Sequence, residues 1–270
     1  MKRLSLLLFL SFPVLAQQQS LDVVSPVILS SGKAYASMSF ARFHKATFPL
    51  SGLEGELTKI GTINFMFSYS GMVELAFDGT ILNLLSISKR YPAFNSAITS
   101  TNNPVGDVGD LTLWTKIYLL NENRSLLSLS LRTGVQLPNA SNESGLGIDE
   151  MNFYSSLLFE KHFAGIWIFN IGFAILGSPT EFSAQHDMLT YGLKYVFPIT
   201  SSTMVFLQAA GRKGHEGTGI YNLAHGKAGV EIHFNNIKFF GSGVLNFAPS
   251  DNSYGVELGV GYSFQLISPE

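Results

Sequence analysis

Apolar residues alternate with polar or small residues along much of the chain. In residues 254–266 every second position is apolar, and Gly, Glu, Ser or Gln occupies the positions between. Residues 227–235 and 126–137 show the same alternation. Successive side chains of a β-strand point to opposite faces of its sheet, so a period of two is typical of strands. The pattern predicts an all-β protein whose strands have one apolar and one polar face.

About twelve strands are expected when the whole chain is read in this way. They lie near residues 34–46, 62–70, 72–88, 109–120, 125–138, 151–162, 165–177, 187–199, 202–213, 227–235, 237–248 and 253–266. Short connections alternate with long ones, which are expected at 47–61, 89–108, 139–150, 178–186, 214–226 and 249–252. An even number of strands joined alternately by tight turns and long loops is typical of an up-and-down antiparallel β-barrel in a membrane. Both chain ends would lie on the tight-turn side, which is periplasmic.

The alternation alone does not say which face of the barrel points outward, because a soluble barrel of the lipocalin type has the same period. Charged residues make up only 13% of the chain, against roughly 25% in soluble domains. A lumen enclosed by twelve strands is also wide, so that polar side chains fill it more readily than apolar ones. We therefore predict a closed transmembrane barrel over residues 34–266, with a secreted soluble barrel or sandwich as the alternative.

The first sixteen residues resemble a secretory signal peptide. Lys2 and Arg3 precede an apolar run of about 13 residues that ends at Ala16, whereas a membrane-spanning helix needs about 20. No apolar run of 18 residues follows, which argues against a helical membrane protein. Residues 17–33 precede the first strand, and their apolar stretch Val23–Leu29 has no obvious partner. We expect this segment to lie inside the barrel as a plug, and residues 267–270 to form a tail.

Composition excludes several other classes of protein. The chain has no Cys, which rules out a disulfide scaffold and a cysteine-ligated metal or redox centre. Its 17 basic residues are outnumbered by 19 acidic ones, so no excess positive charge is available for nucleic acid. The expected partners are instead outer-membrane lipid, the outer-membrane assembly machinery and a small-molecule solute. The expected location is the bacterial outer membrane.

Charged residues on the polar face are the candidates for the lining of the lumen. Trp114 is included with them because its side chain is expected on the same face. The full set is Glu74, Asp78, Trp114, Lys116, Arg132, Glu160, Lys194, Lys227 and Glu231. A turn at residues 121–124 would place Trp114 opposite Arg132 and Lys116 opposite Ser130, so that a cation could lie over an aromatic ring. These side chains either set the selectivity for a solute or fill the barrel as an internal salt-bridge network.

Histidine provides little support for catalysis or metal binding. None of the six histidines is followed two places on by Ser, the pattern of one outer-membrane phospholipase type, and His186-Asp187 is the one adjacent His/Asp pair. His215, Glu216 and His225 share a Gly-rich loop, but their irregular spacing favours a solvated loop over a metal site. We therefore expect no catalytic residues, no metal and no cofactor.

Two long loops, 89–108 and 214–226, are expected to restrict the outer mouth of the barrel. The first contains several rigid or bulky residues that suit a constriction folded inward, namely Tyr91, Pro92, Phe94 and Pro104. Conformationally stiff residues in a long loop are consistent with such a role.

One hairpin carries a recognisable motif. Its residues are Gly109, Asp110, Leu111 and Lys116 on the first strand, and Gly134, Leu137 and Pro138 on the second. This pattern, within residues 107–178, resembles an outer-membrane barrel family assigned to the MetA pathway of phenol degradation. The resemblance implies a pore or transporter for small, hydrophobic or aromatic compounds.

The last strand offers a second comparison. Gly259–Phe264 is similar to the G-x-x-Φ-x-Φ ending, with Φ an apolar or aromatic residue, that the outer-membrane assembly machinery reads. It departs from that ending at Leu258, where a polar residue is usual, and in the residues that follow Phe264. Two other functions stay open beside a channel: a non-conducting structural or adhesion barrel, and a lipid-modifying enzyme.

Overall fold

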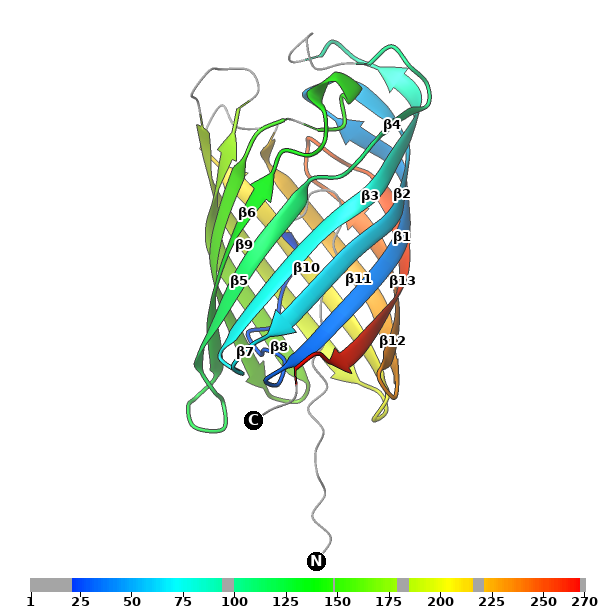
Figure 1. The fold of residues 1–270 in the computed structure, drawn as a ribbon. Coiled ribbons are helices and arrows are strands. Elements are labelled where there is room, and N and C mark those ends of the chain that lie inside the picture. Colours follow the sequence, from blue (N-terminus) through cyan, green and yellow to red (C-terminus); the bar gives the residue numbers. More distant parts are fainter. Residues whose placement is uncertain (1–20, 94–99, 148, 179–184, 216–220, 268–270) are drawn as a thin grey trace, which may run out of the picture.

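The structure is a computed structural model that describes residues 21–93, 100–147, 149–178, 185–215 and 221–267. In this part of the chain, twelve long antiparallel strands form a closed barrel and one short strand, β4, extends its rim (Figure 1). The strands are β1 Lys33–Phe48, β2 Leu53–Ser68, β3 Val73–Arg90, β4 Val105–Asp107, β5 Leu111–Leu120, β6 Ser128–Leu137, β7 Asn152–His162, β8 Ile166–Gly177, β9 Gln185–Pro198, β10 Thr203–Gly214, β11 Leu223–Phe234, β12 Ile237–Asn246 and β13 Tyr254–Gln265. The predicted all-β barrel is confirmed.

The barrel closes where the first strand meets the last. β1 pairs with β13 from Lys33 opposite Gln265 to His44 opposite Tyr254, which brings the blue and red strands of Figure 1 side by side. β4 and β5 both pair with β3, so they act as two pieces of one strand that is interrupted at residues 108–110. Each of the twelve long strands thus has a paired strand on both sides, as a barrel surrounded by lipid requires.

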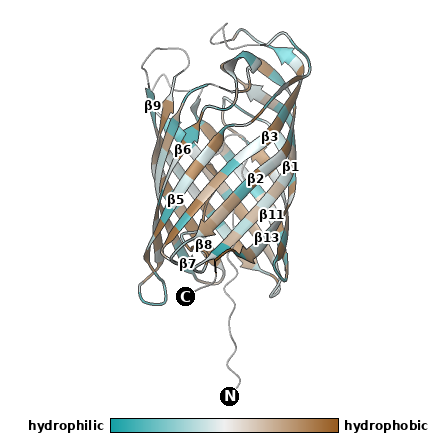
Figure 2. Cartoon of the chain, in the orientation of Figure 1, coloured by the Kyte–Doolittle hydropathy of each residue, from teal (hydrophilic) through white to brown (hydrophobic). Residues whose placement is uncertain are grey.

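Apolar side chains cover the outside of the wall. On β13 the outward residues are between 44% and 63% exposed, and they are Tyr254, Val256, Leu258, Val260 and Tyr262. Figure 2 shows the resulting alternation of hydrophobic and hydrophilic bands along the strands. An exposed apolar belt of this extent suits lipid rather than water. No helix in the described residues is long and apolar enough to cross a membrane.

One predicted loop is wrong. Residues 47–61, expected as a long connection, are mostly strand, because β2 begins at Leu53 after a tight turn. The pairing of β1 with β2 shifts register between Ser39 and Phe40, and Gly61 has a positive φ of 69°. As a result Lys59 and Thr62, three residues apart, are both buried. Such a bulge breaks the period of two, which hides the strand in the sequence.

Candidate functional site

The interior of the barrel is lined with charged side chains. The nine residues that the alternation assigned to the lumen, Glu74, Asp78, Trp114, Lys116, Arg132, Glu160, Lys194, Lys227 and Glu231, are all buried. Further charged residues of the wall are buried inside as well, among them Lys59, Lys238 and Glu257. Neither Lys238 nor Glu257 was among the predicted lumen residues, although the alternation in 237–248 and 253–266 is a signal that could have found them, whereas the bulge in β2 concealed Lys59.

Most of these charges form ion pairs between strands. Lys116 lies 2.8 Å from Glu74, and Glu231 lies 3.5 Å from both Lys194 and Lys238. A buried charge is tolerated when an opposite charge and further hydrogen bonds compensate for lost water. This part of the lumen therefore has the character of a salt-bridge network.

Trp114 lies between a carboxylate and a guanidinium. Its indole N–H donates to Asp78, and the guanidinium carbon of Arg132 lies 3.6 Å from the ring centroid. The expected register is wrong by two residues, because Trp114 pairs with Gly134 and Lys116 with Arg132. The connection covers residues 121–127 rather than 121–124, and turn length sets the register of a hairpin. Even so, the predicted contact forms, because Arg132 is the diagonal neighbour of Trp114 across the two strands and its guanidinium lies over the indole ring.

Gly134 is explained by the same indole. A Cβ built at this position would overlap the Trp114 ring, so only glycine lets the ring lie flat across the neighbouring strand. The adjacent motif residues shape the rim: the Gly109 amide donates to the Thr80 carbonyl at 2.7 Å, and Leu111 pairs with Leu137. These motif residues therefore shape the β5–β6 hairpin and its contact with β3.

Residues 21–29 run through the lumen instead of joining the wall. Val24 exchanges two hydrogen bonds with the Asn170 side chain, of 2.7 and 2.9 Å. The Ser25 hydroxyl donates to Glu160 at 2.6 Å, and the Leu29 amide donates to Glu74 at 3.1 Å. A segment without strand partners must satisfy its backbone polar groups elsewhere, and here the lumen side chains do so.

Two lumen residues bind the carbonyls of this segment. Lys116 donates to the Ser25 and Val27 carbonyls at 3.3 and 3.1 Å, and the Ser130 hydroxyl donates to the Pro26 carbonyl at 2.6 Å. The segment thus fills the tight-turn half of the lumen. The Glu74–Lys116 ion pair therefore binds the segment on both sides: Glu74 accepts from a backbone amide of the segment, and Lys116 donates to two of its backbone carbonyls.

Asp22 anchors the inner end of the segment. Its carboxylate lies 2.7 Å from the Lys227 ammonium and accepts a hydrogen bond of 2.8 Å from Gln208. His225 lies 3.5 Å from the same carboxylate. The described part of the segment begins next to these groups, at Leu21. Between this point and the long-loop end, the interior of the barrel contains a cavity.

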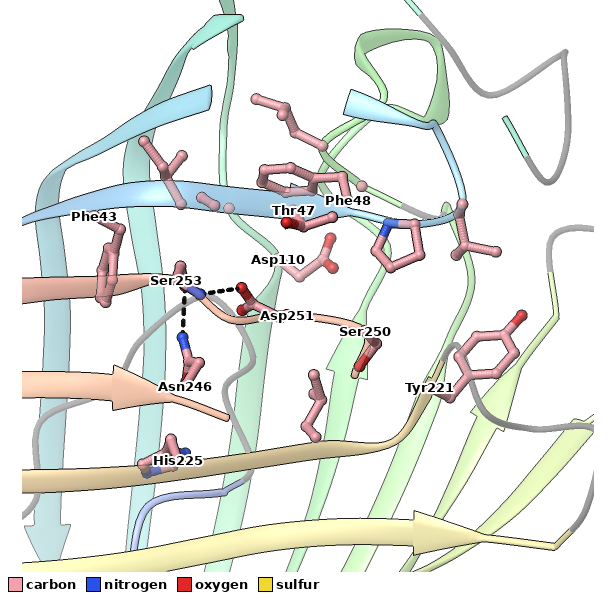
Figure 3. Close-up of a pocket in the computed structure, with 18 of the residues that line it drawn as sticks. Phe43, Thr47, Phe48, Asp110, Tyr221, His225, Asn246, Ser250, Asp251 and Ser253 are labelled. Atoms are coloured by element: carbon pink, nitrogen blue, oxygen red, sulfur yellow. Dashed lines mark hydrogen bonds between the residues drawn. The ribbon is translucent and has the colours of Figure 1, made fainter. Parts of the chain in front are cut away.

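A cavity of about 190 Å³ occupies this upper part of the lumen. Figure 3 shows Phe43, Thr47 and Phe48 on one side, and Asn246, Asp251 and Ser253 beside them. Its floor includes Asp22, Lys59, His225 and Lys227, while other walls come from residues 140, 145–147, 250, 251 and 253. The cavity therefore combines an apolar side with a charged floor.

Two acidic groups at the rim of the cavity are held by backbone amides. Asp110 accepts from the amides of Asn139 and Ala140 at 3.1 and 2.9 Å, and burial raises its pKa despite these bonds. Asp251 accepts from the Ser253 amide at 3.0 Å, and burial likewise raises its pKa. Both carboxyl groups fix the loops that surround the cavity.

The loop residues that the sequence singled out lie mainly at the rim. Tyr91 donates from its hydroxyl to Glu54 at 3.0 Å, and Arg90 donates to the carbonyls of the 100–102 stretch. No described residue of 89–108 lines the cavity. Phe94 lies outside the described residues, and Pro104 follows a cis peptide bond. Among the described residues, the lining near the mouth comes from 46–51, 140 and 145–147, and the predicted loop 214–226 contributes Tyr221.

The histidines contact carboxylates or aromatic rings. His44 lies 2.6 Å from Glu56, His162 lies 2.7 Å from Glu122, and the centroid of the His186 ring lies 4.4 Å from that of Tyr221, with the two rings tilted by 36°. The described part of the chain contains no cluster of three acidic or histidine side chains that fits a metal ion. Glu216 lies outside that part, as do residues 1–16, which the sequence assigned to a signal peptide.

The fold is similar to that of known outer-membrane barrels. An outer membrane channel from Pseudomonas putida F1 superposes with a TM-score of 0.67 at 14% identity, over 90% of this chain and 99% of that chain. The translocator domain of the autotransporter NalP from Neisseria meningitidis gives a TM-score of 0.53 at 12% identity, over 87% and 90% of the two chains. No protein-family model and no curated protein sequence matches the chain. At these identities the likeness shows the barrel fold alone.

Proposed function

We propose that the chain is an outer-membrane channel for the passive passage of small solutes, and that residues 21–29 restrict its lumen. The observation that carries the proposal is a cavity open toward the long-loop end inside a closed barrel whose outer wall is apolar. Such a wall places the barrel in lipid, and the polar interior then provides a path that lipid does not.

The solutes we propose are small hydrophobic or aromatic compounds. The resemblance of the 109–138 hairpin to the MetA-pathway phenol degradation family supports this choice. The apolar side of the cavity, with Phe43, Phe48 and Leu57, supports it independently. The likeness to the Pseudomonas putida channel supports a channel of the same architecture.

Solute flux tests the proposal. The protein would be reconstituted in liposomes, and the entry of phenol and small aromatic acids would be compared with that of sugars of similar size. The proposal predicts that aromatic compounds enter faster than sugars, since the cavity offers them apolar contacts. Protein-free liposomes provide the control for direct crossing of the bilayer. An inserted protein that adds no flux of any solute contradicts a channel.

A second function is favoured by the hydrogen bonding of residues 21–29. Lumen side chains bind this segment through Asn170, Glu160, Glu74 and Ser130, which is what a permanently filled, structural barrel would show. A structural or adhesion barrel would carry its partner on the long loops. The flux experiment distinguishes the two functions, because a structural barrel passes nothing.

A further inference from the structure

The floor of the upper cavity contains a lysine that makes no ion pair within the described residues, where Glu257 is the carboxylate that interacts with it most strongly through space. Lys59 is 1% exposed, lines the cavity, and its ammonium has no hydrogen-bond partner among the described residues. The nearest aromatic group is the Phe43 ring, whose centroid lies 5.6 Å from the ammonium. Burying a charged group without such a partner is costly, so this arrangement calls for a specific explanation.

The other charged groups on the cavity lining are already bound. Asp22 is paired with Lys227, and Arg212 donates to the Tyr221 carbonyl at 2.8 Å. The rim carboxylates of Asp110 and Asp251 accept backbone amides, as described above. Lys59 is therefore the cation on this lining whose ammonium has no hydrogen-bond partner among the described residues.

The strand neighbour of Lys59 is unpartnered as well. Asn83 pairs with Lys59 across β2 and β3, is fully buried, and neither its amide nitrogen nor its amide oxygen has a hydrogen-bond partner in the described residues. On the opposite side, beyond Ala41, Glu257 accepts from Ser39 at 2.9 Å and makes no ion pair with Lys59. Among the described residues Asn83 does not line the cavity, so the donor that this part of the lining offers to a carboxylate is the Lys59 ammonium.

The rest of the cavity suits an apolar body rather than a free inorganic anion. Phe43, Leu57 and Val244 belong to one buried apolar cluster that includes Leu146, and all four line the cavity. The volume of about 190 Å³ is sufficient for a compound of one ring. Binding sites for small molecules commonly combine such apolar walls with a few converging polar groups.

We propose that this cavity binds a small monocarboxylate with an apolar body, whose carboxylate lies at Lys59. The apolar body packs against Phe43, Leu57 and Val244. This inference names the substrate class of the proposed channel, and its biological meaning rests on that function. Binding itself does not require the lumen to conduct.

Equilibrium binding to the full-length protein in detergent tests the site. Benzoate is the probe, and benzamide, which has the same shape without the charge, is its neutral counterpart. By calorimetry we expect Lys59→Met to weaken benzoate binding at least about tenfold, because a charge-assisted hydrogen bond is lost. Lys59→Arg should retain most of the affinity. Lys161→Met, which changes an exposed lysine at the tight-turn end, should bind as the unaltered protein does.

Equal benzoate binding by Lys59→Met and the unaltered protein would overturn the site, as would equal binding of benzamide and benzoate. Absence of benzoate binding to the unaltered protein would overturn it too. Should Lys59→Met fail to fold, Val244→Phe keeps the charge but fills the cavity, and it is expected to abolish binding. Benzoate binding without flux would support the site and contradict the channel. Flux without benzoate binding would do the reverse.

Discussion

Two buried lysines show how the halves of the lumen differ. Lys116, in the tight-turn half, lies 2.8 Å from Glu74 and donates to the carbonyls of Ser25 and Val27. Lys59, in the long-loop half, is equally buried, yet its ammonium has no hydrogen-bond partner in the described chain. The same residue type is therefore paired where the inner segment fills the lumen, and lacks a hydrogen-bond partner in the described residues where the lumen is hollow.

The largest effect on stability is expected at Lys116. Lys116→Met leaves the Glu74 carboxylate buried without its counter-charge and removes two hydrogen bonds from the inner segment. Breaking a buried ion pair from one side costs about 3–5 kcal/mol in the free energy of unfolding. Urea unfolding of the protein in lipid vesicles measures this loss.

The matched control is Lys161→Met. Lys161 also forms an ion pair, at 2.7 Å from Glu122, but its side chain is 46% exposed. An exposed pair contributes about 0–1 kcal/mol, so the control should unfold close to the unaltered protein. Equal losses in the two variants would show that the tight-turn half does not depend on its buried pair.

A smaller effect of opposite sign is expected at Lys59. Lys59→Met removes an ammonium that is buried without a partner, and replaces it with an apolar side chain of similar length. Removing an uncompensated buried charge should raise the free energy of unfolding by about 1 kcal/mol or more. The same urea titration measures it, with Lys59→Arg as the variant that keeps the charge. A loss of stability comparable to that of Lys116→Met would contradict the difference between the two halves.

The sequence predicted most of the wall because the period of two assigns each side chain to a face. The strands from β5 to β13 lie within a few residues of their expected ranges. β2 was missed where Gly61 and the shift at Ser39 break the alternation, and Lys59 was missed for the same reason. A bulge depends on how two strands pair, which a single strand's pattern does not contain.

Contacts between side chains inside the lumen were harder to predict than the face of the strand on which each side chain lies. The alternation placed Trp114 and Arg132 inside, but their register depended on a turn whose length the sequence did not fix. The apolar stretch Val23–Leu29 suggested an inner segment. Its partners, such as Asn170 and Ser130, are brought together only by closure of the barrel, so no local pattern identifies them.

The central claim is that residues 21–29 restrict a lumen that otherwise conducts. Single-channel conductance in planar bilayers tests it most directly, comparing residues 17–270 with a chain that lacks residues 17–31. A chain in which Gly and Ser replace residues 21–29 controls for length. The account predicts that deletion and replacement both raise conductance by about tenfold or more, since they empty the tight-turn half of a twelve-stranded barrel. Conductance that is unchanged in both variants would contradict it.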